Sequence, residues 1–336
     1  MSLTEAPKPE QKIIVGFGEI PDEYKDKLRL SPSRLCAFDE SPAHYESKYI
    51  LKETEKTESM EEGNIVHMGV LEPAKHARLY VAEEAPPAGL VKTIDEAKAY
   101  LDRMQIPYKA SLKRPDLMAL IEESLSDETD PATVLYDAWY AARYTGKTVI
   151  SHKLMRACLR IRDRIKKSLT LNFLISDGEA EKLGWAYYVE YDILMCFKMD
   201  YFKVLSKPVA QLGGAQAIVT DLKTVPDVRE RKFKWKIWDD SMHVQAAIYI
   251  DIMQAYTGLK SIFVWILAER AAPYLTRGAF PKDPTIEAGR MRYHKLIRDF
   301  INCTNTNTWP QPFEELSETE LPDIAYESIE YLEEVQ

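Results

Sequence analysis

The stretch Ala217-Ile218-Val219-Thr220-Asp221-Leu222-Lys223-Thr224 changes from apolar to alternating polar residues within one short run. It predicts a buried strand over residues 217–219 that leads into the polar positions. Because side chains along a strand alternate between faces, Asp221 and Lys223 project to the same side. The stretch therefore predicts a carboxylate and an ammonium side by side at the end of a buried strand.

The elements around this stretch predict a layered fold. Residues 187–197 alternate between apolar and other side chains, which predicts a strand with one apolar face that ends near Asp200. A hairpin would bring Asp200 beside Asp221. A helix over residues 240–256 and an apolar strand over residues 261–267 follow. The order helix, strand, strand, helix, strand predicts an α/β (α+β) fold with a mixed central sheet flanked by helices.

Serine–proline pairs mark helix starts in the N-terminal third. Ser31 and Ser41 are each followed by proline, a pattern that predicts an N-cap with proline in the first helical turn. A longer helical pattern covers residues 59–80, is interrupted by Pro73 and has His67 in its middle. The N-terminal third is therefore expected to be helical.

Composition divides the chain into three parts. Residues 1–28 are expected to form a disordered or extended lead-in, because the first residues are polar and include two prolines. Residues 29–312 form the expected folded domain. It carries a helical insertion at about residues 93–126, which is too small to hold much core by itself. Residues 313–336 form an acidic tail.

The net charge of −9 conceals an uneven distribution. Residues 313–336 contain nine acids and no Lys or Arg, so the rest of the chain is formally neutral (−9 minus −9). Within it, residues 143–170 hold nine Lys or Arg against one Asp, and the basic run at residues 229–238 includes Trp235 and Trp238. Local basic fields attract phosphate backbones. A solvated helix face and an acidic disordered end explain such runs equally well.

Composition also disfavours several classes of protein. No run of about 18 apolar residues exists, so no membrane-spanning segment is expected. The N-terminus lacks the apolar core of a signal peptide. Cys36, Cys158, Cys196 and Cys303 are widely spaced and form no CxxC motif, which indicates reduced cytosolic thiols rather than zinc ligands or disulfides. A cytoplasmic location is therefore expected.

The acids and the lysine suit metal-dependent cleavage of a phosphodiester. Mg²⁺ takes octahedral oxygen ligands and keeps several waters, so one or two carboxylates and the substrate phosphate suffice. Two ions about 4 Å apart would activate the attacking water and stabilise the leaving oxygen, while Lys223 would offset charge in the transition state. Gln245 and Tyr249 are four residues apart and so share a helical face that can reach the same site. A lone D-x-K is weak evidence, and the combination is more specific.

Together these motifs resemble the PD-(D/E)xK nuclease superfamily. Within it they are similar to the RecE-type double-strand DNA exonucleases of phages and prophages, which are related more distantly to lambda exonuclease. The matching pieces, which run in order between about residues 29 and 312, are Leu30-Ser31-Pro32-Ser33-Arg34-Leu35, Ser41-Pro42-Ala43-His44-Tyr45, Gly63-Asn64-Ile65-Val66-His67, Val70-Leu71-Glu72-Pro73, Lys198-Met199-Asp200, Asp221-Leu222-Lys223-Thr224, Gln245-Ala246-Ala247-Ile248-Tyr249, Ala268-Glu269-Arg270-Ala271-Ala272-Pro273-Tyr274, and Cys303 with Trp309-Pro310.

The resemblance implies a metal centre. His67 takes the position of the family's metal-site histidine, and Asp200 and Asp221 take those of its two metal-binding acids. The carbonyl of Leu222 is the further implied ligand. Two Mg²⁺ ions are expected, for which Mn²⁺ can substitute.

The resemblance also implies catalytic roles. Lys223 matches the catalytic lysine, and Gln245 and Tyr249 match the QxxxY element of the RecB-like branch. The residues before Asp200 depart from the family's usual Lys-x-Arg-x-Asp run, so Asp192 is the alternative for that acid.

Some RecB-like nucleases hold an iron–sulfur cluster with one N-terminal and three C-terminal cysteines. Only Cys303 follows the QxxxY element in this chain. Four thiolates cannot be assembled in that arrangement, so no cluster is expected.

Further residues remain open between structural and functional roles. Glu181 or Glu179 would add a carboxylate to the metals or simply begin a strand, and Glu269 would lie at the site or make a structural ion pair. Trp235 and Trp238 would stack on frayed bases, although core packing is favoured. Four basic residues of the helix over residues 151–167 would contact the DNA backbone or remain solvated. These four are Arg156, Arg160, Arg164 and Lys167.

By the resemblance we expect a Mg²⁺-dependent exonuclease that degrades double-stranded DNA from its ends, 5′ to 3′, and releases 5′-mononucleotides. The exposed 3′ strand would serve phage-type homologous recombination in the cytoplasm of a bacterial or phage-infected host cell. A homo-oligomeric ring of three or four chains and a single-strand annealing recombinase as partner are implied as well. The acidic tail would mimic DNA for that partner or gate the channel of the ring. Two alternatives stay open: a PD-(D/E)xK endonuclease or nickase, and a non-catalytic DNA-end-binding protein on the same fold.

Overall fold

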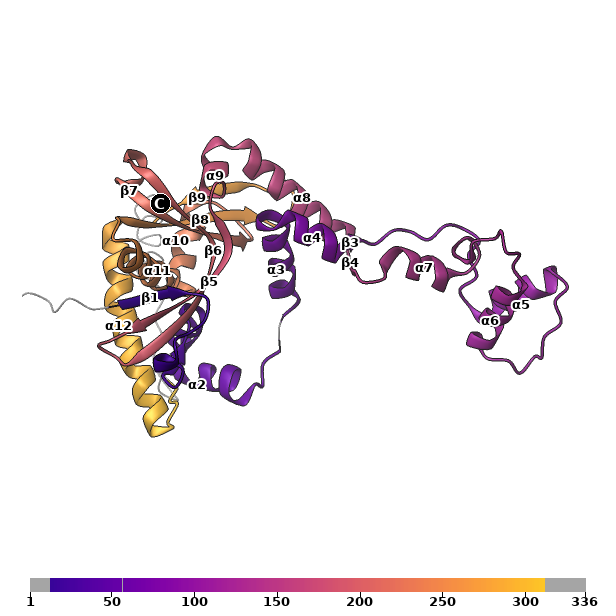
Figure 1. Cartoon of the computed structure of the whole chain (residues 1–336), viewed down its shortest axis with the longest axis horizontal. Coiled ribbons are helices and arrows are strands. Elements are labelled where there is room, and N and C mark those ends of the chain that lie inside the picture. Colours follow the sequence, from indigo (N-terminus) through magenta and orange to yellow (C-terminus); the bar gives the residue numbers. More distant parts are fainter. Residues whose placement is uncertain (1–12, 56, 312–336) are drawn as a thin grey trace, which may run out of the picture.

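The computed structural model describes residues 13–55 and 57–311 of the chain. At its centre lies a mixed sheet, in which seven strands are described, in the order β1-β5-β6-β7-β8-β9 with β2 paired to β6 (Figure 1). The strands are β1 (Ile13–Phe17), β2 (Leu28–Leu30), β5 (Glu179–Tyr188), β6 (Ile193–Val209), β7 (Ala215–Val225), β8 (Ser261–Glu269) and β9 (Thr276–Ala279). The predicted mixed sheet is confirmed.

Strand direction follows from the connections. The antiparallel neighbours β5, β6 and β7 are joined by short turns, whereas β7 and β8 are parallel. Parallel strands need a long crossover, which is supplied here by α10 (Glu230–Asp239) and α11 (Met242–Thr257). The residues that join β7 to α11 are therefore close to the carboxyl end of β7.

Helices cover both faces of the sheet (Figure 1). One apolar core includes side chains of α1 (Pro32–Glu40), α11 and α12 (Asp283–Thr306). The other includes side chains of α3 (Glu58–Leu71), α8 (His152–Lys167) and α9 (Leu169–Leu174). The strands between the two cores contribute fully buried side chains such as Trp265, and burial of this kind is the main stabilising contribution to such a fold.

The predicted helix starts are confirmed in the N-terminal third. The hydroxyl of Ser31 accepts the Arg34 N–H at 3.2 Å and begins α1. The hydroxyl of Ser41 accepts the His44 N–H at 3.0 Å and begins α2 (Pro42–Tyr45). The interrupted helix over residues 59–80 is α3 followed by α4 (Pro73–Leu79).

One strand prediction is wrong. Residues 187–197 are not one strand, because β5 ends at Tyr188 and β6 begins at Ile193. The alternation runs straight through a hairpin turn in which Asp192 has a φ of +50°. The lead-in, expected to be disordered or extended, contains the extended strand β1 from Ile13 onward and reaches β2 at Leu28; β1 pairs with β5 and β2 pairs with β6. Residues 1–12 and the acidic tail at 313–336 lie outside the described residues.

Residues 83–147 leave the body of the molecule as a projection, which we call the arm (Figure 1). Its base is a parallel pair of short strands, β3 (Tyr80–Ala82) and β4 (Thr148–Ile150). Its helices are α5 (Ile94–Arg103), α6 (Arg114–Ser124) and α7 (Tyr136–Tyr144). The arm has a small core of its own that extends from Val91 to Leu135. The insertion expected at about residues 93–126 thus contains α5 and α6 but not the ends of this core.

Candidate active site

The candidate site lies at an interruption in the pairing of β6. The edge of β6 that faces β7 pairs with β2 at residues 193–195 and with β7 from Tyr201 onward. Residues 196–200 of this edge, which we call the seam, have no partner strand among the described residues. Buried backbone groups need hydrogen-bond partners, so side chains must provide them in the seam.

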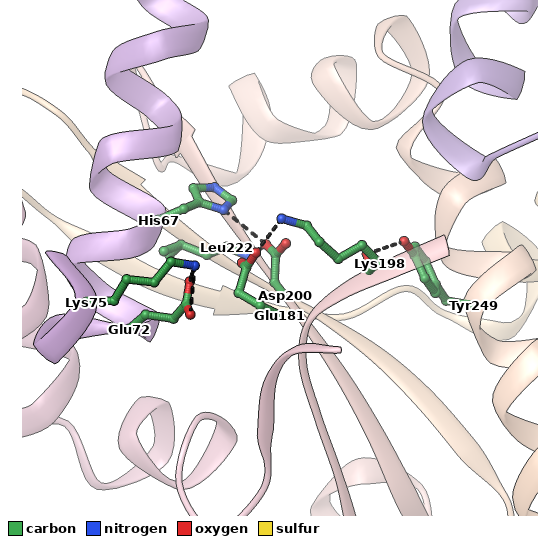
Figure 2. Close-up of polar contacts among 8 residues, drawn as sticks. All are labelled: His67, Glu72, Lys75, Glu181, Lys198, Asp200, Leu222 and Tyr249. Atoms are coloured by element: carbon green, nitrogen blue, oxygen red, sulfur yellow. Dashed lines mark hydrogen bonds and ion pairs between the residues drawn. The ribbon is translucent and has the colours of Figure 1, made fainter. Parts of the chain in front are cut away.

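Asp200 is the first of these side chains. Its Oδ2 accepts the backbone N–H of Leu222 at 2.9 Å, in the place of a strand-to-strand bond (Figure 2). The same oxygen lies 3.3 Å from Nδ1 of His67, which reaches the seam from α3. Burial raises the pKa of Asp200 above its ordinary value, an effect that His67 opposes and the carboxylate of Asp221 reinforces. Asp200 is therefore a carboxyl group held in place by two contacts, and its burial disfavours the charged form.

Asp221 and Lys223 lie across the seam on β7. Nζ of Lys223 donates to Oδ1 of Asp221 at 2.9 Å, as their spacing on one strand predicts. Burial opposes the charge on Lys223, but the carboxylates of Asp221 and Asp200 outweigh it and raise the pKa of this ammonium. Oδ2 of Asp221 is buried and has no hydrogen-bond partner among the described residues. An uncompensated buried carboxylate oxygen is costly, and this oxygen could accept a cation.

The QxxxY pair reaches the seam from α11, on the opposite face of the sheet from α3. The hydroxyl of Tyr249 donates to the backbone carbonyl of Lys198 at 2.7 Å and so satisfies a group that the missing strand leaves unpaired (Figure 2). Burial and the nearby carboxylates of Asp200 and Asp221 raise the pKa of Tyr249, which keeps this donor protonated. Gln245 lies one turn earlier and lines a cavity of about 440 Å³ together with Lys198 and Tyr249.

Glu181 reaches the cluster from β5. Its partner is Lys198, a residue to which the sequence analysis assigns no role. Glu181 lies opposite Asp200 in the strand register, between the pairs Ala180↔Tyr201 and Lys182↔Met199. Its carboxylate pairs with the ammonium of Lys198 (Figure 2). Glu181 has a φ of +54°, which costs of the order of 1–3 kcal/mol for a non-glycine residue and is typical of functional sites. The register is a long-range property, so no local pattern signals this pair.

Two candidate acids lie away from the seam. Glu269 accepts the backbone N–H of Val228 at 3.2 Å, and its strand partner is Val225, four residues beyond Asp221. Asp192 lies in the hairpin turn and pairs with Lys27 at 2.7 Å. The structure therefore assigns Glu269 a structural hydrogen bond and removes Asp192 as the alternative to Asp200.

The basic residues of α8 are exposed. The helix buries Ala157, Cys158, Ile161 and Ile165 against the core that it shares with α3. Arg156, Arg160, Arg164 and Lys167 lie on its solvent-exposed surface. They make no ion pair with any carboxylate in the described ranges. Their contact with DNA remains a prediction.

Trp235 and Trp238 are exposed, so the core packing favoured for them is wrong. Both lie on α10 with 59% and 69% of their surface exposed. The buried face of α10 is filled instead by Phe233, whose ring meets that of Trp265 at 5.4 Å. Aromatic residues usually pack in a core, which favours burial of both tryptophans. Phe233, however, already fills the buried face of α10.

The donor set fits an open cation site. No group of three or more His, Cys, Asp or Glu side chains in residues 13–55 and 57–311 is arranged to hold a metal ion by itself. Mg²⁺ does not require one, because waters and a substrate phosphate complete its shell. The unpartnered oxygen of Asp221, the carboxylate of Asp200 and the imidazole of His67 would be the protein ligands of such a cation. Burial raises the pKa of the adjacent Cys36 thiol to about 12, so a neutral thiol does not compete with them.

This geometry can be compared with that of known proteins. No helix within the described ranges has the length and apolar character needed to cross a membrane. No curated protein sequence matches this chain. A crystal structure of a protein from Eubacterium rectale, provisionally named an exonuclease, aligns over 93% of this chain and 98% of its own, with 12% identity and a TM-score of 0.45. The family model for the PDDEXK-like domain of unknown function DUF3799 matches residues 31–320. The chain belongs to this PDDEXK-like family, and thereby to the PD-(D/E)xK nuclease superfamily.

Proposed function

We propose that this protein is a Mg²⁺-dependent exonuclease that degrades double-stranded DNA from its ends. The observation that carries the proposal is the seam, where Asp200, Asp221 and Lys223 converge around a buried oxygen that lacks a partner. This set of two carboxylates and one ammonium is the chemistry that hydrolysis of a phosphodiester requires. Membership of the PDDEXK-like family supports the nuclease part of the proposal.

Each residue has a role that follows from its contacts. Asp200, Asp221, His67 and the carbonyl of Leu222 would hold the cation, which when bound polarises the phosphate and activates water. Mn²⁺ accepts the same oxygen ligands and would substitute.

Lys223 remains an ammonium beside Asp221 and donates to the phosphate oxygens as negative charge develops there. Gln245 lines the cavity next to the seam and would orient the water or the phosphate. Tyr249 holds the backbone of β6 in place and is a positioning residue rather than a reacting group. Glu181 would provide an additional carboxylate if a second cation binds.

The finer parts of the proposal rest on the sequence resemblance. These are the 5′-to-3′ direction, the release of 5′-mononucleotides, the ring of three or four chains and the annealing recombinase as partner. A cytoplasmic place of action in a bacterial or phage-infected cell belongs with them. The acidic tail, proposed to mimic DNA or gate the ring, lies outside the described residues; deleting residues 313–336 without a change in DNA affinity, processivity or partner binding would refute that role.

The deciding experiment compares linear 5′-phosphorylated duplex DNA with the same DNA as a covalently closed circle. It is run with Mg²⁺, with EDTA, and with the Lys223→Ala variant in Mg²⁺. We expect mononucleotides from the linear form alone, and no product with EDTA. Loss of the ammonium should lower the rate about 10²- to 10³-fold. Lys207→Ala is the matched control, because Lys207 is exposed and lies on β6 beyond the seam.

The other outcomes assign the alternatives. Cleavage of the closed circle would establish an endonuclease or nickase. Binding to ends without cleavage of either form would establish a non-catalytic end-binding protein. Equal activity of Lys223→Ala and Lys207→Ala would show that the seam is not the active site.

Helix α8 is the proposed contact for the DNA backbone. Replacing Arg156, Arg160 and Arg164 with glutamine should weaken duplex binding at low salt and reduce its salt dependence, because each lost phosphate contact removes about one unit from the logarithmic slope. The measurement is affinity for a duplex of fixed sequence at several salt concentrations. An unchanged slope would leave these arginines as solvated surface.

A further inference from the structure

Helix α10 exposes two large aromatic side chains that the proposed mechanism does not use. Trp235 and Trp238 are 59% and 69% exposed. They are three residues apart on one helix, so they are neighbours on its surface. Large exposed apolar groups that lie together usually mark an interaction site. The pair therefore marks a candidate binding surface.

The same stripe of α10 carries positive charge. Arg231 and Lys234 precede Trp235 and Trp238 at spacings of four residues, so the four side chains share one exposed face. Lys234 pairs with Glu230 at 3.1 Å. Arg231 makes no ion pair with any carboxylate of the described residues. The exposed face thus combines aromatic rings with at least one uncompensated cation.

Trp238 contacts one neighbouring ring although most of its surface is exposed. Its ring stacks on the imidazole of His243, with 5.5 Å between ring centres and 13° between planes. His243 is buried in the first turn of α11, and its Nδ1 lies 3.2 Å from the carbonyl of Ile237. One face of the Trp238 ring is against His243, which leaves the other face available to stack on another planar group.

The position of α10 connects this face to the candidate active site. The helix joins β7, which carries Asp221 and Lys223, to α11, which carries Gln245. Phe233 on the buried face of α10 contacts Trp265, which is the register partner of Asp221, so α10 lies beside the strands that carry the site.

We propose that this face of α10 binds the unpaired bases of single-stranded nucleic acid next to the active site. The proposal rests on the proposed function for the source of that strand, which would be the frayed or newly exposed end. Bases stack on aromatic side chains whatever their sequence, while nearby cations attract the backbone. A duplex offers no free base faces, so the charged aromatic face favours a single strand over a double one.

The test is a binding measurement on the full chain in EDTA, so that hydrolysis cannot contribute. The probes are a fluorescent oligothymidylate of about 20 nucleotides, long enough for a binding site of this kind, an abasic strand of equal length, and a duplex. We expect the Trp235→Ala/Trp238→Ala double variant to bind oligothymidylate about 5- to 100-fold more weakly for each base that is no longer stacked. Binding to the abasic strand should be weak already and should not change.

Two further variants protect the test from trivial outcomes. Trp235→Phe/Trp238→Phe keeps aromatic faces and should retain binding within about threefold, which a general loss of folding would not allow. Tyr140→Ala removes an exposed aromatic residue from α7 in the arm and should have no effect. Unchanged affinity of the double alanine variant would overturn the proposal, as would an equal loss for the abasic strand.

A change in oligomeric state without a change in binding would assign the face to a contact between copies of the chain and would also overturn the proposal. The nuclease experiment on linear and circular DNA is separate. Hydrolysis with unchanged oligothymidylate binding refutes the role of α10 alone. Loss of stacking in a chain that hydrolyses nothing refutes the proposed catalysis alone.

Discussion

The seam and the arm are built in opposite ways. The seam gathers His67, Asp200, Asp221 and Tyr249 from four elements that lie far apart in the sequence. The core of the arm forms within residues 91–135 and has no side chain in common with the two cores of the sheet. The seam therefore depends on the register of the whole sheet, whereas the arm depends on its own short segment. Changes in one should leave the other intact, and four experiments test this separation.

The largest effect is expected from Asp221→Asn. The change removes a proposed cation ligand and the partner of Lys223 together, and should lower the hydrolysis rate by about 10³-fold or more. Glu269→Gln is the control and should stay within about threefold of the parent activity, since its hydrogen bond to Val228 is structural. Comparable losses in both variants would place the site elsewhere along the strands.

Tyr249→Phe should have the next largest effect. The hydroxyl is lost and the carbonyl of Lys198 stays buried without its partner, which should lower the free energy of unfolding by about 1–3 kcal/mol. Because a positioning residue is lost rather than a reacting group, kcat should fall while KM for DNA stays the same. Tyr256→Phe changes an exposed tyrosine of the same helix and should be neutral in denaturant unfolding and in kinetics. An unaltered kcat in Tyr249→Phe would show that the seam tolerates an unsatisfied carbonyl.

Thr93→Ala tests the arm from within. The Thr93 hydroxyl and the Glu96 carboxylate form a capping box at the start of α5. Its loss should cost about 0.5–2 kcal/mol. Hydrogen–deuterium exchange should quicken in α5 and α6 but not in β6 or β7. Faster exchange in the sheet would mean that arm and sheet unfold as one unit.

Removal of the arm should have the smallest effect on catalysis. Because β3 and β4 are parallel, the connection from Ala82 back to Thr148 is a crossover, which needs about a dozen or more glycine and serine residues. A chain without residues 84–146 should fold, and its rate on linear duplex should stay within about threefold of the parent. Circular dichroism and the mononucleotide assay provide the measurements. Loss of the folded sheet, or complete loss of activity, would show that the two regions are not independent.

The same division explains what could be predicted from the sequence. Local signals located the helix caps at Ser31 and Ser41, and strand alternation placed Asp221 beside Lys223, because these features depend on neighbours in the chain. The partnership of Glu181 with Lys198 depends on the register of β5 against β6, which no local pattern encodes.

Other errors have other causes. The alternation over residues 187–197 continues through a turn, because a hairpin whose strands share one apolar face repeats the same period on both sides. The exposure of Trp235 depends on whether the buried face of α10 is already occupied, and Phe233 occupies it. The edges of the arm's core at Val91 and Leu135 meet in an isolated bridge between residues far apart in the sequence, so composition does not reveal their contact.

The hydrogen bond from Leu222 to Asp200 gives that carboxylate the rigidity of backbone. A surface carboxylate loses rotational freedom when it captures a cation, whereas Asp200 has given up much of that freedom during folding. Cation affinity then depends directly on the alignment of β7 with β6. A slip of β7 by one residue would turn Asp221 to the other face and remove the donor of Asp200 in the same movement.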